Sequence, residues 1–260
     1  MCEILGASAA RRTDYNIYLK EFFSHAGTNP HGWGLALFEK GEPRVKKEPV
    51  SALQSAYVKE LLLAPVESEL ILAHIRFATK GGIEYRNTHP FILRDGAERV
   101  WTLVHNGTIF ESEVLTGYYA RQFGTTDSER ILRYLVSRIN EESEKKGGDA
   151  RILSDAERIR IMEDVLYTIT PENKVNVLIS DGELLYAHTN YRDSLHMYID
   201  RYGAIISTKP LDSGRWHELP LNTLLVFRRH EQIYQGSPHD NEFFDSEEKM
   251  RFLFLDYSGI

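Results

Sequence analysis

The order of strand-like and helix-like segments constrains the fold of this 260-residue chain more than any other feature. The first third reads mainly as short apolar runs of strand length, the middle as amphipathic helices, and the part from Lys174 onward as short strands again. This order differs from the regular alternation of strand and helix that builds parallel sheets. It therefore predicts an α+β fold with largely antiparallel sheets.

The first third gives several local predictions. "CEILGASA" indicates a strand, and the following "YNIYLKEFFSHAG" indicates a helix capped by Thr13 or Asp14. "GWGLALFEKGEPRVKKEPV" predicts a hairpin with its turn at 40–43. Residues 53–63 predict a helix that ends before Pro65. "ELILAHIRFA" and "RVWTLVHN" have the length of buried strands, although periodicity does not separate such runs from buried helix.

The strongest helix signal is "TTDSERILRYLVSRINEESEKK", where Thr126 and Glu129 form a capping-box pattern. A break at Gly147–Gly148 follows, and "SDAERIRIMEDVLYTIT" then predicts a second capped, amphipathic helix. Two neighbouring helices explain this break better than a domain boundary. We therefore expect a single domain over 1–260, with a short acidic and aromatic tail from about residue 236.

The last third predicts a series of short strands. "VNVLIS" and "ELLYAH" flank a turn at Asp181–Gly182, and "AIIST" and "TLLVFRR" follow.

Composition excludes several classes of function. One cysteine in 260 residues forms no internal disulfide and no thiolate zinc cage, which favours a reducing compartment. The histidines show no metal-binding spacing, so we expect neither a structural metal nor a cofactor. No apolar run approaches the ~20 residues of a membrane span, and the N-terminus lacks a secretory signal. With a net charge of −7 and dispersed basic residues, we expect a cytoplasmic protein that binds neither membrane nor nucleic acid.

Cys2, that one cysteine, follows the initiator methionine directly. Removal of Met1 would leave a free α-amine beside the thiol. The amine titrates at ~7.7–8.0 and the thiol at ~8.5, so the amine can accept the thiol proton near neutral pH. A lone cysteine is more often a small buried apolar residue than a nucleophile. Its chemical role therefore depends on other residues.

Three further stretches carry candidate chemistry: "HIRFATKGGIEYRNTHPF", "VHNGTI" and "TTDSERIL". Each also has a structural explanation, since Arg76 can end a strand, "HNG" suits a turn, and Asp127 suits a helix start. Together they supply what an acyl-transfer site needs beyond a nucleophile and a base.

The Asn106 side-chain amide and the Gly107 N–H are candidate donors to an oxyanion, each typically worth ~3–4 kcal/mol in the transition state. Thr126 can cap the helix and leave the Asp127 carboxylate free. Arg76 and Asp127 could then hold a free amino acid by its carboxylate and ammonium groups.

In this order and spacing, Cys2, "AHIRFATKG", "NTHPF", "LVHNGTI" and "TTDSERIL" resemble the class-II glutamine amidotransferase domain of the N-terminal-nucleophile hydrolases. The resemblance continues through "NVLISDGELLYAH" and "AIISTKPL". It implies a four-layer αββα sandwich of two mainly antiparallel sheets.

The same resemblance assigns roles to individual residues. It implies Cys2 as nucleophile with its amine as base, Asn106 and Gly107 as the oxyanion hole, and Arg76, Thr79, His89 and Asp127 as the glutamine-binding residues.

Phe77 and Lys80 depart from members fused to a sugar-phosphate synthase, which carry Trp and His at these positions. No synthase domain is expected here, so the chain looks like the standalone members.

Three functions stay open. The protein could hydrolyse glutamine and pass ammonia to a separate synthase partner, hydrolyse a small γ-glutamyl compound with the same residues, or be a non-catalytic ligand-binding relative. Retention of Cys2, Asn106, Gly107, Arg76 and Asp127 together argues against the third.

Overall fold

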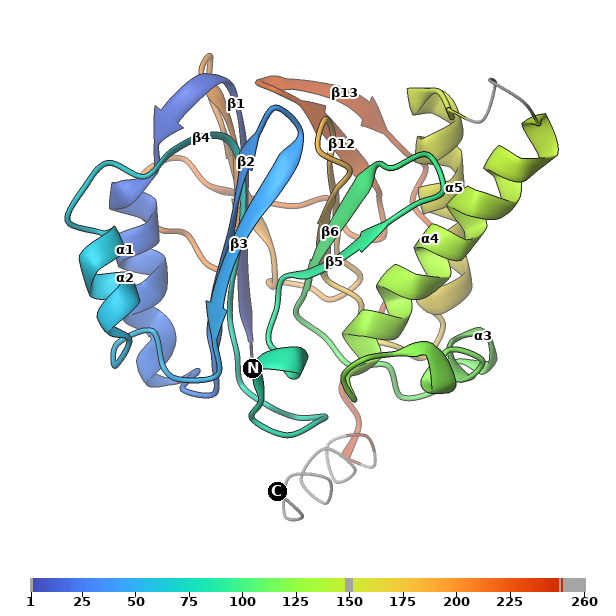
Figure 1. The fold of residues 1–260 in the computed structure, drawn as a ribbon, viewed down its shortest axis with the longest axis horizontal. Coiled ribbons are helices and arrows are strands. Elements are labelled where there is room, and N and C mark those ends of the chain that lie inside the picture. The colour runs from blue at the N-terminus through green and yellow to red at the C-terminus, as the bar shows by residue number, and fades with distance from the viewer. Residues whose placement is uncertain (1, 148–151, 248, 250–260) are drawn as a thin grey trace.

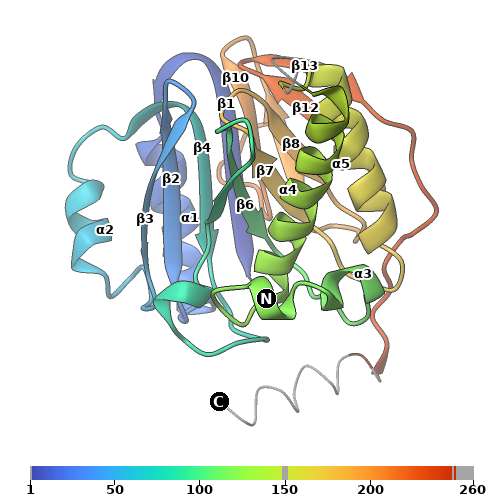
Figure 2. The same ribbon diagram turned by 45° about the vertical axis from the view of Figure 1, so that its right-hand side comes forward.

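The computed structural model describes residues 2–147, 152–247 and 249, and the strands of these residues form two antiparallel sheets packed face to face (Figure 1). Helices cover the outer face of each sheet, so the layers are helix, sheet, sheet and helix (Figure 2). The predicted four-layer αββα sandwich is confirmed. The helices are α1 (Asn16–Ser24) and α2 (Ala56–Leu61) on the first sheet, and α3 (Glu113–Thr116), α4 (Asp127–Lys146) and α5 (Asp155–Ile169) on the side of the second.

The first sheet places its longest strand, which begins next to Cys2, between two partners. Glu3 pairs with Ile75 on one side, and Leu5 pairs with Ser207 on the other. The strand order is β11 (His217–Glu218), β9 (His196–Ile199), β10 (Gly203–Ser207), β1 (Glu3–Asp14), β4 (Glu67–Ile75), β2 (Trp33–Glu39) and β3 (Glu42–Glu48).

The second sheet contains the strands that lead into the candidate oxyanion residues. Its order is β13 (Glu231–Gln235), β12 (Leu225–Arg228), β8 (Leu185–His188), β7 (Val177–Ser180), β6 (Val100–His105) and β5 (Phe91–Arg94). The β7–β8 turn contains Gly182 at φ +90°, where an added Cβ would lie 2.2 Å from the Gly41 carbonyl oxygen. This close approach brings the β7–β8 turn against the β2–β3 turn of the first sheet.

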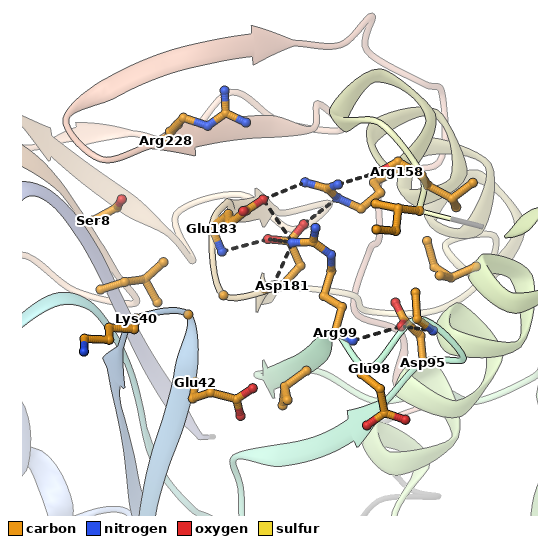
Figure 3. Close-up of a pocket in the computed structure, with 18 of the residues that line it drawn as sticks. Ser8, Lys40, Glu42, Asp95, Glu98, Arg99, Arg158, Asp181, Glu183 and Arg228 are labelled. Atoms are coloured by element: carbon orange, nitrogen blue, oxygen red, sulfur yellow. Dashed lines mark hydrogen bonds and ion pairs between the residues drawn. The ribbon is translucent and has the colours of Figure 1, made fainter. Parts of the chain in front are cut away.

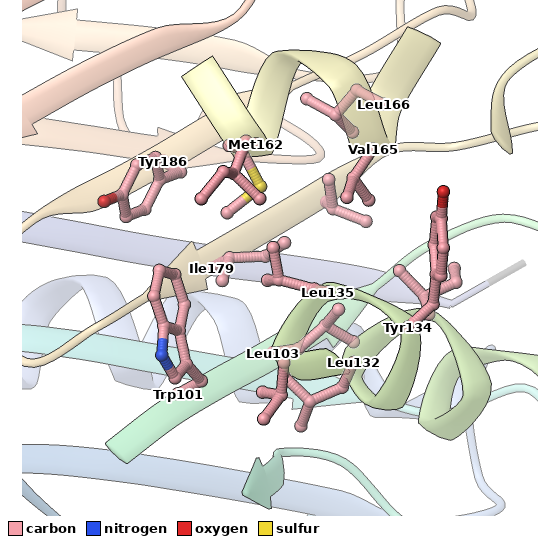
Figure 4. Packing of buried hydrophobic residues seen from close by; sticks show 14 of the residues in the cluster. Trp101, Leu103, Leu132, Tyr134, Leu135, Met162, Val165, Leu166, Ile179 and Tyr186 are labelled. Carbon is pink, nitrogen blue, oxygen red and sulfur yellow. The ribbon is translucent and has the colours of Figure 1, made fainter. Parts of the chain in front are cut away.

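Apolar side chains fill each of the three interfaces between the layers. Ile4 lies in the cluster between the sheets, whereas Leu5 packs against α1 on the other face of β1. The second sheet packs on α4 and α5 through Trp101, Leu135 and Met162 (Figure 4). Burying both faces of β1 explains why its sequence shows no alternation of polar and apolar residues.

Several predicted boundaries need correction. The predicted helix 53–63 is shorter, because Ser55 takes the N-cap and accepts a hydrogen bond from the Val58 N–H over 3.1 Å. The first strand continues to Asp14, and Tyr15 rather than Thr13 or Asp14 is the N-cap of α1.

Strands β5, β9 and β13 were not predicted, because their exposed or half-exposed residues give weak apolar patterns. The break after Gly147 and the end of the predicted tail, 250–260, lie outside the described residues. Within residues 2–147, 152–247 and 249, no helix is long and apolar enough to cross a membrane.

Candidate active site

Cys2 lies at the end of the sandwich where β1 begins. Because side chains alternate along a strand, it shares a face with Ile4, which is buried between the sheets. The Phe77 N–H donates to the Cys2 Sγ over 3.3 Å, and the thiol donates to the Phe77 carbonyl oxygen over 3.3 Å. The sulfur is thus held against the loop that follows β4.

Burial raises the pKa of the Cys2 thiol above its ordinary value and is the largest influence on it. The Phe77 N–H and the nearby Arg76 guanidinium act in the opposite direction but do not cancel the rise in pKa. The thiol is therefore neutral near pH 7. A nucleophilic role for Cys2 requires a base within reach of the sulfur.

Arg76 organises the loop over residues 78–83. Its Nη1 donates to the Gly82 carbonyl oxygen over 2.9 Å, and its Nη2 donates to the carbonyl oxygens of Lys80 and Gly81 over 3.0 and 2.9 Å. A guanidinium has five N–H donors, so these three bonds leave two for a ligand. Arg76 therefore shapes the loop and can still bind a carboxylate.

Lys80, one of the departures from the synthase-linked members, ties this loop to the segment that follows β6. Its Nζ donates to the Ile109 carbonyl oxygen over 2.5 Å. On the other side, Asn87 Nδ2 donates to the Gly82 carbonyl oxygen over 3.1 Å and to Thr125 Oγ1 over 3.0 Å. Hydrogen bonds to Ile109 and to Asn87 thus attach the loop to two other segments of the chain.

Asn106 and Gly107 follow β6 directly. The Asn106 N–H donates to the Asn176 carbonyl oxygen over 2.9 Å, and Thr108 and Lys174 exchange backbone hydrogen bonds of 3.0 and 3.1 Å. A Cβ on Gly107 would lie 2.0 Å from the Lys174 carbonyl oxygen, so this position accepts only glycine. Close packing thus explains this glycine and is compatible with an oxyanion role.

Asp127 is the first residue of α4, with Thr126 as the N-cap. The prediction that its carboxylate is left free is wrong: Oδ2 accepts from the Ile109 N–H over 2.8 Å and Oδ1 from the Ser128 N–H over 2.8 Å. These bonds orient the carboxylate and leave acceptor capacity on Oδ2. The predicted capping box is half formed, because Glu129 binds other backbone N–H groups instead of that of Thr126.

Thr79 and His89 occupy different environments. Thr79 lies half-buried in the loop that Arg76 organises. His89 is 4% exposed, and its ring stacks on His74 with centroids 4.0 Å apart. Neither ring nitrogen of His89 has a hydrogen-bond partner among residues 2–147, 152–247 and 249. Its role in a substrate pocket stays a prediction.

Sequence reasoning missed Lys174, a buried lysine beside the candidate oxyanion residues. Burial lowers the pKa of Lys174 to about 8, and its Nζ lies 3.4 Å from the centroid of the Tyr191 ring. Its ammonium also interacts electrostatically with Cys2. The one weak signal in the sequence is a lysine three residues before the buried strand β7.

The described part of the predicted tail packs beside this site. The Phe243 N–H donates to the Asn190 carbonyl oxygen over 2.7 Å, and its ring stacks on Phe110 with centroids 5.7 Å apart. Phe110 follows Ile109, whose N–H binds Asp127. The tail therefore contributes to the surroundings of the candidate site.

A cavity of about 580 Å³ lies at the opposite end of the sandwich, among the hairpin turns (Figure 3). Arg158 Nε and Asp181 Oδ2 form a 2.8 Å ion pair there, and Glu183 contacts both Arg158 and Arg99. Among the described residues, no group of three or more His, Cys, Asp or Glu side chains is arranged to hold a metal.

The fold brings the sequence-predicted residues together at the Cys2 end. Cys2, Arg76 and Asp127 interact electrostatically with one another, and His89 interacts with Arg76. Asn106 lies at the end of β6 beside the strand that follows Lys174. A thiol, a guanidinium, a carboxylate and a backbone amide on glycine are the groups that an amide-cleaving thiol site requires.

Residues 1–201 match the family of class-II glutamine amidotransferases, and the chain belongs to this family. An uncharacterized protein of Methanocaldococcus jannaschii is 30% identical over 268 residues, covering 91% of this chain and 72% of that protein. The γ-glutamyl-hercynylcysteine sulfoxide hydrolase of Mycobacterium tuberculosis is 27% identical over 201 residues, covering 75% of this chain and 74% of that enzyme.

A solved structure has the same fold. The crystal structure of a predicted glutamine amidotransferase from Pseudomonas aeruginosa superposes with a TM-score of 0.66 at 24% identity, covering 90% of this chain and all of that one.

Proposed function

We propose that this protein is a thiol-dependent glutamine amidotransferase in which Cys2, freed by removal of Met1, attacks the side-chain amide of glutamine. The observation that carries the proposal is that two 3.3 Å hydrogen bonds hold the Cys2 thiol against Phe77, the residue after Arg76, at the end of the sandwich where the charges of Arg76 and Asp127 influence it. Membership of the class-II family supports the reaction class. Met1 itself lies outside the described residues.

In the proposed reaction, the α-amine of Cys2 takes the thiol proton and the thiolate forms a C–S bond with the amide carbon. The Asn106 side-chain amide and the Gly107 N–H donate to the resulting oxyanion, and each such donor is worth ~3–4 kcal/mol. The C–N bond then breaks, and ammonia leaves with the proton held by the α-ammonium. Water hydrolyses the γ-glutamyl thioester to glutamate and regenerates the thiol.

Substrate binding uses the donors and acceptors that the loop leaves unused. An N–H group of Arg76 that the loop leaves unused binds the α-carboxylate of glutamine, and Oδ2 of Asp127 accepts from its α-ammonium. Thr79 and His89 line the pocket. In this proposal the reaction takes place in the cytoplasm, and the ammonia passes to a separate synthase partner.

A second candidate, hydrolysis of a small γ-glutamyl compound, is supported by two observations. One is the similarity to the hydrolase of Mycobacterium tuberculosis. The other is the Lys80–Ile109 contact at the position where synthase-linked members carry His. The acyl chemistry is the same, and the two candidates differ in the amine that leaves.

The test is a comparison of kcat/KM for ammonia release from glutamine with kcat/KM for amine release from a panel of γ-glutamyl dipeptides. We expect glutamine to be the better substrate. A preference for the panel by tenfold or more would select the hydrolase, and no turnover of either by protein lacking Met1 would contradict both candidates.

A further inference from the structure

Glu3, the residue after the candidate nucleophile, is a buried carboxylate with three side-chain partners. It is 2% exposed. Its Oε1 accepts from Lys209 Nζ over 2.6 Å and from Asn29 Nδ2 over 3.4 Å, and its Oε2 lies 2.8 Å from His25 Nδ1. These partners come from the connection between α1 and β2 and from the segment after β10. Glu3 thus ties the start of β1 to two other parts of the chain.

The residues of β1 after Glu3 do little to fix the register of this strand against its neighbours β4 and β10. A half-buried strand is fixed by its apolar face, because a one-residue slip would expose that face. Residues 3–9 are all buried, with small or apolar side chains after Glu3 on both faces. Glu3 is the only charged residue between positions 2 and 10. The apolar pattern therefore discriminates little between the native register and its neighbours.

A slip of β1 by one residue would have two consequences. It would turn the Glu3 carboxylate toward the face of Ile4, among apolar side chains such as Leu72 and Leu178, without its polar partners. It would also turn Cys2 toward the helix layer and away from Phe77. The same register of β1 therefore gives the Glu3 carboxylate its polar partners and places the Cys2 sulfur against Phe77.

We propose that Glu3 is a positioning residue that fixes the register of β1 and so places the Cys2 sulfur for reaction. The inference rests on the proposed role of Cys2. Chain termini are poorly ordered unless they are tied down, and after removal of Met1 the nucleophile would itself be the terminus. The paired carboxylate supplies the directional contacts that an apolar strand end lacks.

The other ring nitrogen of His25 contacts a second carboxylate: its Nε2 lies 3.4 Å from Glu21 Oε1. His25 therefore lies between two carboxylates, and the Lys209 ammonium also faces Glu3. Removing Glu3 leaves His25 with Glu21 and leaves Lys209 half exposed to solvent. Neither partner becomes a buried unpaired charge.

The test is Glu3→Leu, which fills the same space with an apolar side chain. Lys209 is half exposed to solvent and His25 keeps Glu21, so neither partner is left as a buried charge and we expect the melting temperature to change little. We expect kcat for glutamine to fall about 100-fold with KM within about threefold of the parent, as for a misplaced reacting atom. Backbone amides of residues 3–8 should exchange hydrogen at least about tenfold faster. Glu3→Gln, which keeps an acceptor for Lys209, should recover part of the lost kcat.

Glu163→Leu is the matched control, because it removes a carboxylate that accepts from the Tyr234 hydroxyl, far from β1 in the sequence. It should leave both readouts unchanged. If Glu3→Leu does not fold, Glu3→Gln, which keeps the shape of the side chain and an acceptor for Lys209, gives the same direction of change at about a tenth of the size.

A folded Glu3→Leu variant with parental exchange in residues 3–8 overturns the proposal. Hydrogen exchange needs no substrate, so this result is separable from a failure of the proposed glutamine chemistry.

Discussion

The two ends of the sandwich both bury charged and polar groups, but they satisfy them differently. At the turn end, Arg158 and Asp181 pair over 2.8 Å, and the Tyr186 hydroxyl also donates to Asp181 over 2.9 Å. At the Cys2 end, both ring nitrogens of His89 and Nδ1 of His74 have no hydrogen-bond partner within residues 2–147, 152–247 and 249. Buried polar groups are normally satisfied, so the unpaired ring nitrogens of these two stacked histidines are consistent with a ligand site at this end.

The difference separates stability from function in one fold. The turn end stabilises the closed sandwich through a saturated ion-pair network. The Cys2 end keeps unused donors and acceptors on Arg76 and Asp127 next to a neutral thiol. Substitutions at the first should therefore change the free energy of unfolding, and substitutions at the second should change turnover.

The largest effect should come from Cys2→Ala. It removes the nucleophile, and loss of a nucleophile in a comparable hydrolase lowers kcat by up to about a millionfold. We expect turnover of glutamine to fall by at least about a thousandfold while the melting temperature stays within a few degrees of the parent. Undiminished turnover in this variant would show that the reaction does not depend on Cys2 and that the Cys2 end is not the active site.

Arg158→Met should give the next largest effect, on stability. It leaves the Asp181 carboxylate buried without its cation, and breaking such a pair typically costs about 3–5 kcal/mol. Urea unfolding would measure the loss, and kcat per folded molecule should stay at the parental value. A large fall in kcat with unchanged stability would show that the turn end contributes to turnover and not to stability, contrary to this account.

Asp127→Asn should weaken substrate binding. The amide oxygen can keep one backbone hydrogen bond, but the negative charge opposite the substrate ammonium is lost. We expect KM for glutamine to rise about thirtyfold, or about 2 kcal/mol, with a smaller change in kcat. Steady-state kinetics decides the matter, and a variant with parental KM would remove Asp127 from the binding site.

The smallest effect should be a pH dependence of stability at the Cys2 end. Burial holds the pKa of His89 well below 6.5 and lowers that of His74 to about 3. The unfolded chain therefore binds more protons below pH 6.5, so stability is full above that pH and falls as the pH drops toward the folded pKa values.

His89→Phe removes one of these groups and should reduce the acid loss by about 1.4 kcal/mol at about pH 5.5. Unfolding by urea at pH 7.5 and 5.5 measures the effect. Equal acid losses in parent and variant would show that His89 takes up its proton in the folded protein.

Much of the fold could be predicted because several segments carry strong local signals. The hairpin turn at Lys40–Gly41, the cap at Thr126 and the turn at Gly182 all lie where the sequence places them. Edge strands such as β13 were missed because their side chains are largely exposed and carry no apolar period.

The candidate site was harder to predict because its contacts join residues distant in the sequence. The Ile109 N–H donates to Asp127 because α4 packs on the second sheet, and Lys80 donates to the Ile109 carbonyl oxygen because the two sheets pack together. The sequence alone does not distinguish Glu3 from the other residues of its apolar strand, because its partners His25 and Lys209 are distant in the chain. Residue identity suggested the chemistry, and the tertiary fold supplied the partners.

The central claim is that Cys2 acts as an N-terminal nucleophile. Intact-mass analysis of active protein, before and after exposure to an electrophilic glutamine analogue, tests it most directly. We predict a mass that lacks Met1, one covalent adduct on Cys2, and no adduct on Cys2→Ala. Active protein that retains Met1, or an adduct that persists in the Cys2→Ala variant, would contradict the claim.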